Sequence, residues 1–300
     1  MAVRVGTLPG RAGTVRRAPS TWTRLARNGR VRGGTLILLI ILLGALAAPL
    51  LATTNPQTPS PAFKNLPPLA LVADGSRSVL GTDALGRDLW SRILYGARIS
   101  LLTGSASVLV ALLIGLPLGL LAGYLGGRVD TAIMRWVDIQ LAIPFFLLAI
   151  TIAAVLGQGL VNVILLLGIT SWVGYTRVVR AQVLIIRELA YIEAARALGC
   201  GSWTILVRHI LPNTWTPILI LASQQVGSMI IAESSLTFLG IGVPPDIATW
   251  GAMIAFGRSY LATAWWVSTI PGLALTITVV AVYFLGDGLR DALDPRLKRT

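Results

Sequence analysis

The sequence predicts an all-α protein that crosses a membrane several times. Of its 300 residues, 55% are hydrophobic and only 12% are charged, and the mean hydropathy is +0.76. A soluble domain of this size needs more charge to cover its surface. Five long stretches contain no Asp, Glu, Lys or Arg. They are 33–63, 99–127, 139–176, 209–232 and 259–286.

Six membrane-spanning helices account for these stretches, because a helix needs about 20 mostly apolar residues to cross the hydrocarbon core. The 139–176 stretch is long enough for two spans, and Gly157-Gln158-Gly159 in its middle is a turn signal. The runs are continuous rather than alternating, which excludes a barrel of strands. The expected spans are 33–52, 99–124, 140–156, 160–172 with an extension to about 179, 214–232 and 264–285.

The distribution of basic residues predicts that both termini face the cytoplasm. The arm 1–32 contains eight arginines and no acidic residue, and with this arm inside, most of the 25 Lys and Arg residues lie on the cytoplasmic side. The net charge of +13 is therefore a topology signal, and no aromatic or motif pattern supports nucleic-acid binding. The first span is expected to be retained, because its apolar stretch exceeds the 7–15 residues of a signal-peptide core.

The expected organisation has three parts. A basic cytoplasmic arm occupies 1–32, a transmembrane domain occupies 33–286 with a cytoplasmic loop at about 181–212, and a cytoplasmic tail occupies 287–300.

The chain lacks the signatures of an enzyme. A phosphate-binding loop requires Gly-Lys followed by Ser or Thr, and neither Lys64 nor Lys298, the two lysines, stands in such a triplet. The single histidine, His209, and the single cysteine, Cys200, predict neither a metal cluster nor an internal disulfide. We therefore expect no catalytic residue, no metal and no cofactor in this chain.

The segment 80–101 leads into the second expected span from the outer side and is rich in charge. On a helix, Asp88 and Arg92 form an i,i+4 pair. Two interpretations stay open, a solvated start of the helix or an outer gate that docks an extracytoplasmic binding protein. The candidate gate residues here are Asp83, Arg87 and Asp88.

A fourth outer candidate is Glu233, about 20 residues after Pro212 and hence near the outer face. There its carboxylate is expected to stay hydrated or to meet an arginine such as Arg258.

Glycines at every fourth position of the second span put a smooth stripe on one helix face. A neighbouring helix, from this chain or from a partner subunit, is expected to pack closely against the stripe. The stripe comprises Gly115, Gly119, Gly123 and Gly127.

The cytoplasmic segment 187–212 predicts a short helical hairpin. Alanine-rich sequence at 187–198 favours a helix, Gly199 permits a turn, and a second short amphipathic stretch, 203–210, returns the chain to the membrane. Pro212 suits the first turn of the fifth span. A hairpin with a small-residue face is shaped to fit a groove on another protein.

This hairpin resembles the EAA loop of ABC importer permeases. It reads Glu193-Ala194-Ala195, then Gly199, then Ile210-Leu211-Pro212. Other segments are similar to signatures of the C-type dipeptide/oligopeptide permease subunits. These segments are 80–101, 233–245 with 249–251, and 285–291 with 294–296. The resemblance covers about residues 33–297 and leaves the arginine-rich arm outside.

The resemblance implies the transmembrane fold of a type I ABC importer in a bacterial inner membrane. It implies as partners a homologous permease subunit, two ABC ATPase subunits that bind ATP and magnesium, and an extracytoplasmic substrate-binding protein. In that family the loop holds the coupling helix, which sits in a cleft of the ATPase. The candidate coupling residues are Glu193, Ala194, Ala195, Gly199, Ile210, Leu211 and Pro212.

A di- or oligopeptide is the implied substrate, but importers of nickel, glutathione and some oligosaccharides share this subunit type. Neutral polar residues in the spans suit a peptide backbone and a sugar equally, so no substrate-binding residue is predicted. They include Asn162, Ser223, Gln224, Gln225 and Ser228. A secondary transporter, the alternative of another class, usually shows repeats and ionisable residues within its spans, and the central parts of these spans have none.

Overall fold

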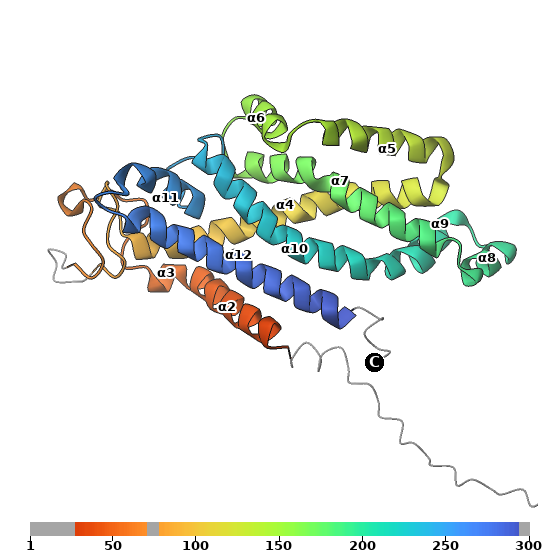
Figure 1. Ribbon diagram of the computed structural model, residues 1–300, viewed down its shortest axis with the longest axis horizontal. Helices are drawn as coiled ribbons and strands as arrows, with labels where there is room; N and C mark the ends of the chain where they lie inside the picture. The colour runs from red at the N-terminus through yellow and green to blue at the C-terminus, as the bar shows by residue number, and fades with distance from the viewer. Residues whose placement is uncertain (1–27, 71–77, 294–300) are drawn as a thin grey trace, which may run out of the picture.

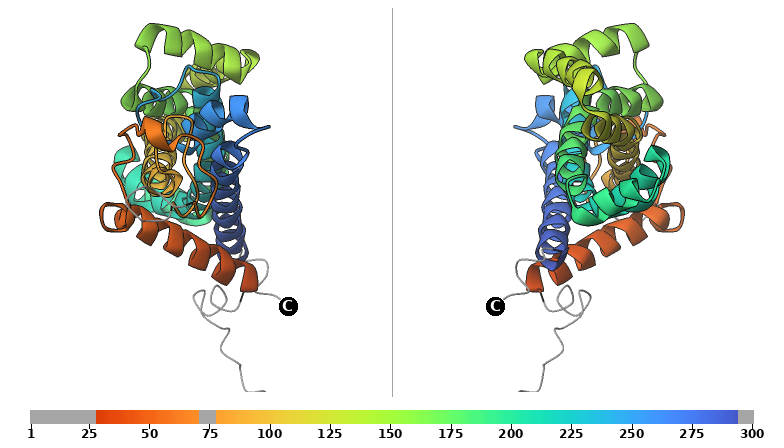
Figure 2. Two further views of the ribbon diagram at one scale, coloured as in Figure 1. Left: turned by 90° about the vertical axis from the view of Figure 1, so that its left-hand side faces the viewer. Right: turned by 90° about the vertical axis from the view of Figure 1, so that its right-hand side faces the viewer.

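The computed structural model describes residues 28–70 and 78–293. Most of the expected arm (1–27) and the end of the expected tail (294–300) lie outside this part. Long helices run side by side within it, as Figures 1 and 2 show, and no strand forms in the described residues. The long helices are α2 (Gly29–Leu46), α4 (Leu89–Leu125), α7 (Leu160–Ile186), α10 (Leu211–Phe238) and α12 (Trp266–Leu293).

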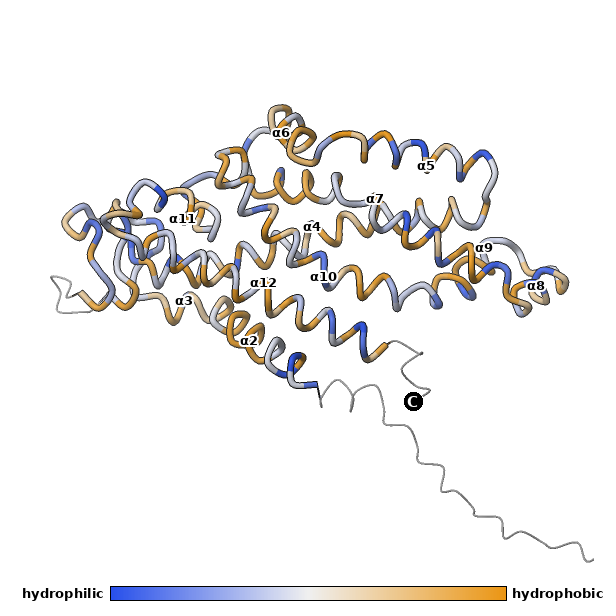
Figure 3. Tube along the Cα trace, in the orientation of Figure 1, coloured by the Kyte–Doolittle hydropathy of each residue, from blue (hydrophilic) through white to orange (hydrophobic). Residues whose placement is uncertain are grey.

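Shorter elements connect the long helices at both ends of the bundle. Near one end lie α3 (Ala48–Leu51), η1 (Pro61–Phe63), α11 (Trp250–Gly257) and η3 (Arg258–Tyr260). At the other end lie α8 (Ala190–Ala197), α9 (Ser202–Thr204) and η2 (Ile205–Ile210). Hydrophilic residues gather around α8, in the first turn of α2 and in the last turns of α12 (Figure 3).

Within the described part, five helices are long and apolar enough to cross a membrane, and a sixth span exists if one bent pair is counted together. The bent pair is α5 (Gly127–Ala142) and α6 (Phe145–Leu156), which meet at 94°. The span expected at 140–156 is therefore not one continuous helix, because the bend falls within it. The 12 residues of α6 reach only about 18 Å, less than the hydrocarbon thickness.

Proline causes this bend. Pro144 has no N–H to donate to a preceding turn, and a residue before proline is pushed towards extended conformations. Ile143 accordingly has φ −92° and ψ 124°.

Four helices are longer than the sequence indicated, including α10 and α12 with 28 residues each. α4 begins at Leu89 rather than at 99, and α7 continues to Ile186. The 37 residues of α4 measure about 55 Å, so this helix extends beyond the hydrocarbon. Its early start follows from Asp88, whose side chain caps the helix by accepting from the Ser91 N–H at 2.8 Å.

The glycine stripe packs α4 against α7 of the same chain. A Cβ added at Gly119 would lie 2.6 Å from the Cβ of Val179, and one at Gly123 would lie 2.6 Å from the Cβ of Val183. The prediction of a close helix seam is thus confirmed, and its partner is internal. Gly127 is not part of the seam, because it starts α5 with a φ of +52°.

Candidate functional site

The short helix α8 ends in a backbone turn that glycine favours. Gly199 has a φ of +79°. Its N–H donates to the Arg196 carbonyl at 2.9 Å, and the Cys200 N–H donates to the Ala195 carbonyl at 3.0 Å. This is the Schellman arrangement, in which a left-handed residue closes the helix. No atom lies within 4 Å of a Cβ added at Gly199, so the constraint is conformational rather than steric.

The second arm of the hairpin is not a separate helix. From Ser202 to Phe238 the chain forms one continuous helical span, so the expected stretch 203–210 is the beginning of this span. Pro212 lies in the first turn of α10, as expected. The π turn of η2 lies directly before Leu211 and Pro212. Proline disrupts regular α-helical bonding through its missing N–H and its ring, and a wider turn accommodates this without ending the helix.

The predicted coupling residues divide between two faces. Ala195 and Ile210 are buried and belong to this chain's own core, where their cluster includes Val183 and Ile218. Their side chains are therefore not free to contact a partner directly, and their role in coupling stays a prediction. They shape the hairpin instead. Glu193, Ala194, Gly199 and Pro212 are exposed, and Leu211 is half-buried.

Two large apolar side chains at the same tip were missed by sequence reasoning. Leu198 is 85% exposed and Trp203 is 74% exposed, on either side of the Gly199 turn. Large apolar groups held in water next to a turn are typical of an interaction site. Their exposure could have been predicted from the sequence, because Leu198 and Trp203 flank the turn at Gly199–Gly201.

At the opposite end, the charged residues before α4 are buried. The Arg87 Nε donates to an Asp83 carboxylate oxygen at 2.7 Å, and the Arg92 Nε lies 3.9 Å from the same oxygen. Arg92 also donates to the Pro56 carbonyl at 2.9 Å. The burial of these side chains contradicts both a solvated segment and a docking surface formed by them, and their role in an outer gate stays a prediction.

Asp88 does not form the expected ion pair with Arg92. Besides capping α4, its carboxylate accepts from the Thr53 hydroxyl at 2.9 Å and the Ser78 hydroxyl at 3.2 Å. Asp88 therefore joins the loop after α3 to the start of α4.

Glu233 is fully buried in the last turns of α10. Its carboxylate accepts from the Thr237 hydroxyl at 3.0 Å and the Ser234 hydroxyl at 3.2 Å. The Thr237 oxygen in turn accepts from the Val243 N–H at 3.1 Å. The expectation of a hydrated carboxylate or a pair with Arg258 is wrong, since Arg258 lies over the Phe238 ring at 5.3 Å.

One face of α10 is polar. Gln224 donates to an Asp287 carboxylate oxygen at 3.2 Å, and Ser228 shares a hydrogen bond with the Tyr283 hydroxyl at 3.0 Å, both on α12. Ser235 continues the same face about two turns further and donates to the carbonyl of Ile231 at 2.8 Å. By contrast, Asn162 donates to the Leu156 carbonyl at 2.6 Å and so closes the turn between α6 and α7.

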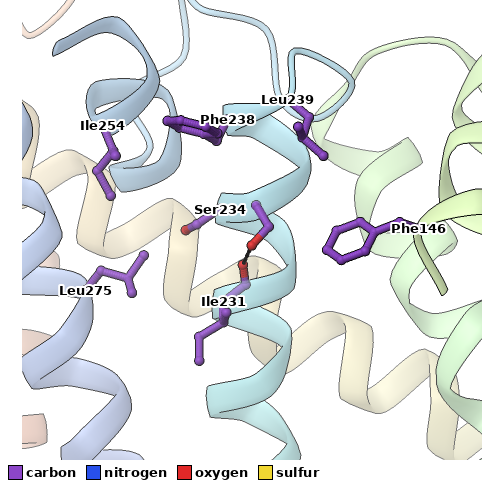
Figure 4. Close-up of a pocket in the computed structure, with 8 residues that line it drawn as sticks. Phe146, Ile231, Ser234, Phe238, Leu239, Ile254 and Leu275 are labelled. Carbon is purple, nitrogen blue, oxygen red and sulfur yellow. Dashed lines mark hydrogen bonds between the residues drawn. The ribbon is translucent and has the colours of Figure 1, made fainter. Parts of the chain in front are cut away.

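A groove of about 400 Å³ opens on this part of α10 (Figure 4). Phe146 of α6 faces it from one side and Leu275 of α12 from the other, while Ile254 of α11 closes its end. The remaining lining residues come from α10 and the residue after it. They are Ile231, Ser234, Ser235, Phe238 and Leu239.

Comparison with known proteins gives the family. The family model "Binding-protein-dependent transport system inner membrane component" matches residues 115–299, and "N-terminal TM domain of oligopeptide transport permease C" matches 20–68. The "Di/tripeptide transport system permease protein DppC" of Pseudomonas aeruginosa is 43% identical over 277 residues, 92% of this chain and 91% of the relative.

Two further similarities are informative. The "Glutathione transport system permease protein GsiD" of Pectobacterium atrosepticum is 49% identical over 219 residues, 73% of each chain. A chain of the MetNI methionine ABC transporter in inward facing conformations matches with a TM-score of 0.56 and 21% identity, over 69% of this chain and 98% of that chain.

These results show that the protein is a multi-pass permease with the fold of a type I ABC importer. The chain belongs to the family of binding-protein-dependent transport system inner membrane components. The resemblance noted in the sequence is thereby confirmed.

Proposed function

We propose that this chain forms half of the membrane pathway of an importer that takes di- or oligopeptides into a bacterial cell across the inner membrane. The observation that carries the proposal is the 43% identity, along 92% of the chain, to a relative named for di- and tripeptide transport. Glutathione is the second candidate substrate, favoured by the 49% identity to GsiD over 73% of the chain.

The polar face of α10 lines the pathway. Gln224, Ser228 and Ser235 follow one another at helical spacing on a helix otherwise apolar enough to span a membrane. Within the membrane, a neutral polar group that faces lipid raises the free energy, whereas one that faces water or a polar substrate can form hydrogen bonds. Their amide and hydroxyl groups suit the backbone of a peptide, and a homologous sister subunit provides the facing wall.

The tip formed by Glu193, Ala194, Leu198, Gly199 and Trp203 docks into an ATPase subunit. Leu198 and Trp203 are the apolar anchors, since a few large side chains carry most of the energy of an interface. Glu193 is exposed and available to a basic group of the partner. The partner ATPases, rather than this chain, bind ATP and magnesium.

Two states of the assembly must differ in their contacts at this tip, because ATP can bias an equilibrium only through such a difference. Closure of the ATPases moves the tips and alternates access to the pathway. At the outer end, the buried Asp83, Arg87, Asp88 and Glu233 hold the gate and its loops in shape, and an extracytoplasmic binding protein docks on the surface that they support.

Uptake by the reconstituted complex tests the substrate. The chain is purified with its native partner subunits, placed in vesicles, and supplied with labelled dialanine, glutathione or Ni²⁺, each with and without ATP. The proposal predicts ATP-dependent accumulation of dialanine that excess unlabelled dipeptide abolishes. ATP-dependent uptake of glutathione or Ni²⁺ alone would contradict it.

Labelling of Cys200 tests the orientation. This exposed cysteine lies in the tip and is expected in the cytoplasm. A thiol reagent that cannot cross the membrane should leave Cys200 unmodified in intact cells and modify it after permeabilisation. Modification in intact cells would place the tip outside and overturn the proposed coupling.

A further inference from the structure

The short helix α8 follows α7 in the chain, but a turn separates the two helices. α7 ends at Ile186 and α8 begins at Ala190. Between them Leu189 is extended, with a φ of −79° and a ψ of 139°, so α7 and α8 do not form one rod. A few residues at the end of a helix are enough to act as a hinge. The angle between α8 and the bundle is therefore set by contacts of the α8 side chains.

Two arginines, one in this turn and one in α8, meet the last turn of α4. The Arg187 Nη1 donates to the Gly123 carbonyl at 2.8 Å, and the Arg196 guanidinium carbon lies 5.7 Å from the centre of the Tyr124 ring. Carbonyls in the last turn of a helix lack partners within the helix and carry partial negative charge, which favours cations there. Arg187 thus fastens the end of α7 to α4, and Arg196 fastens α8 to α4.

The contact of Arg196 determines an angle, whereas its apolar neighbours do not. Ile192 and Ala195 of α8 are buried in the cluster against which Tyr124 packs. Apolar contact of this kind is non-directional, so it holds α8 close to α4 in more than one orientation. A guanidinium is attracted only when it lies over the face of the ring. Arg196 therefore selects the orientation in which α8 sits on Tyr124.

α4 connects this contact to the outer end of the molecule. Along the seam, Gly119 and Gly123 bring α4 so close to α7 that the two helices form one rigid pair. The 37 residues of α4 extend about 55 Å to the buried outer residues Asp88 and Arg92. A small rotation of this pair at the α8 end therefore displaces the outer end.

We infer that Arg196, held over Tyr124, is a positioning residue that fixes the angle of α8 to the α4–α7 pair and so transmits movement of the tip to the outer end of α4. The inference rests on the proposed docking of the tip into an ATPase. Without this contact α8 turns on residues 187–189, and movement of the ATPase changes the angle of α8 instead of moving α4.

Thiol labelling at the outer end of the assembled complex tests the inference without any substrate. Leu85 is exposed shortly before α4, and a parent chain with Leu85→Cys and Cys200→Ser carries its only thiol there. The labelling rate of residue 85 is measured by mass spectrometry, with and without a non-hydrolysable ATP analogue. The analogue should change this rate in the parent complex. An unchanged rate would show that α4 does not carry the movement and would overturn the inference.

Substitutions on both sides of the contact identify the residues that transmit the movement. Arg196→Gln removes the cation, and Tyr124→Leu removes the ring but keeps an apolar side chain. Each should reduce the response to the analogue about two- to fivefold, the equilibrium factor of one exposed cation–π contact. The double variant should respond like either single variant, because both changes remove the same contact. A response that falls further in the double variant would overturn the pairing.

Two matched variants should respond as the parent does. Tyr124→Phe keeps the ring and therefore the cation–π contact. Arg208→Gln removes an exposed arginine from η2, in the other arm of the hairpin. A loss of response in Arg208→Gln equal to that in Arg196→Gln would show a general effect of charge and overturn the role of Arg196.

Co-purification of the ATPase separates this inference from the proposed function. Every variant should retain the ATPase, because the anchors Leu198 and Trp203 are unchanged. An Arg196→Gln complex that binds the ATPase and responds like the parent overturns the inference and leaves the docking intact. Loss of the ATPase from Arg196→Gln places Arg196 in the docking surface and also overturns the positioning role. A parent chain that binds no ATPase contradicts the docking itself, and the inference falls with it.

Discussion

The two ends of the bundle use charged and apolar residues in opposite ways. At the α3–α11 end, Asp83, Arg87, Asp88 and Glu233 are buried and are bonded within this chain. At the α8 end, the large apolar side chains of Leu198 and Trp203 are exposed. Buried, satisfied polar groups rigidify a structure, whereas exposed apolar groups need a partner. The charged residues of the first end therefore find their partners within this chain, whereas the exposed anchors of the tip do not.

Removal of a buried acidic residue at the α3–α11 end and of an exposed one on α5 gives the largest expected contrast. Asp83→Ala leaves Arg87 and Arg92 buried without their counter-charge, which costs about 3–5 kcal/mol of folding free energy. Asp138→Ala breaks an exposed pair with Arg177, which costs about 0–1 kcal/mol. The thermal midpoint and the yield of the purified complex should fall sharply for Asp83→Ala alone. Equal losses in both variants would break the contrast.

Glu233 gives an intermediate effect. Glu233→Ala leaves the buried Ser234 and Thr237 hydroxyls without their acceptor, which costs about 1–3 kcal/mol of folding free energy. Glu233→Gln keeps a carbonyl oxygen in place, so it should assemble with a smaller fall in thermal midpoint. If Glu233→Gln is as damaging as Glu233→Ala, the negative charge itself is needed, and hydrogen bonding is not the explanation.

Gly199 gives the smallest effect on stability and a larger one on coupling. Gly199→Val forces a branched residue into a left-handed backbone conformation. The resulting strain costs about 1–3 kcal/mol and affects only the tip. Asparagine tolerates this conformation, so Gly199→Asn is the matched control. Membrane insertion should be normal for both. ATPase co-purification and substrate-stimulated hydrolysis should fall for Gly199→Val only, and wild-type values for Gly199→Val would show that the turn does not position the docking surface.

Patterns that depend on neighbouring residues were predictable from the sequence. Uncharged stretches predicted the spans, and the four-residue spacing of Gly115, Gly119 and Gly123 predicted a close helix seam, although not that α7 forms its other side. The Gly199 turn was also predictable, because left-handed backbone favours glycine. The bend at Ile143 was also predictable from Pro144, because a residue before proline avoids helical conformations, but it was not predicted.

Patterns that depend on distant residues were not predictable. Charged residues before α4 are ordinarily solvated, and Arg92 is buried only because Pro56, far away in the sequence, supplies a carbonyl to it. The burial of one face of α8 could be predicted in part. Ile192 and Ala195 are three residues apart on one helix face, and that spacing indicates a buried face. Only the structure shows that they pack against this chain's own core.

The central claim is that the α8 end is completed by an ATPase, and substitution of Trp203 tests it most directly. Trp203→Ala removes the exposed anchor at the tip, whereas Trp136→Ala removes a tryptophan of similar exposure, 68%, from α5. Membrane insertion, ATPase co-purification and dipeptide uptake are measured together for both variants. The account predicts normal insertion for both, with loss of ATPase and of uptake for Trp203→Ala only. Full ATPase association and uptake in Trp203→Ala would contradict it.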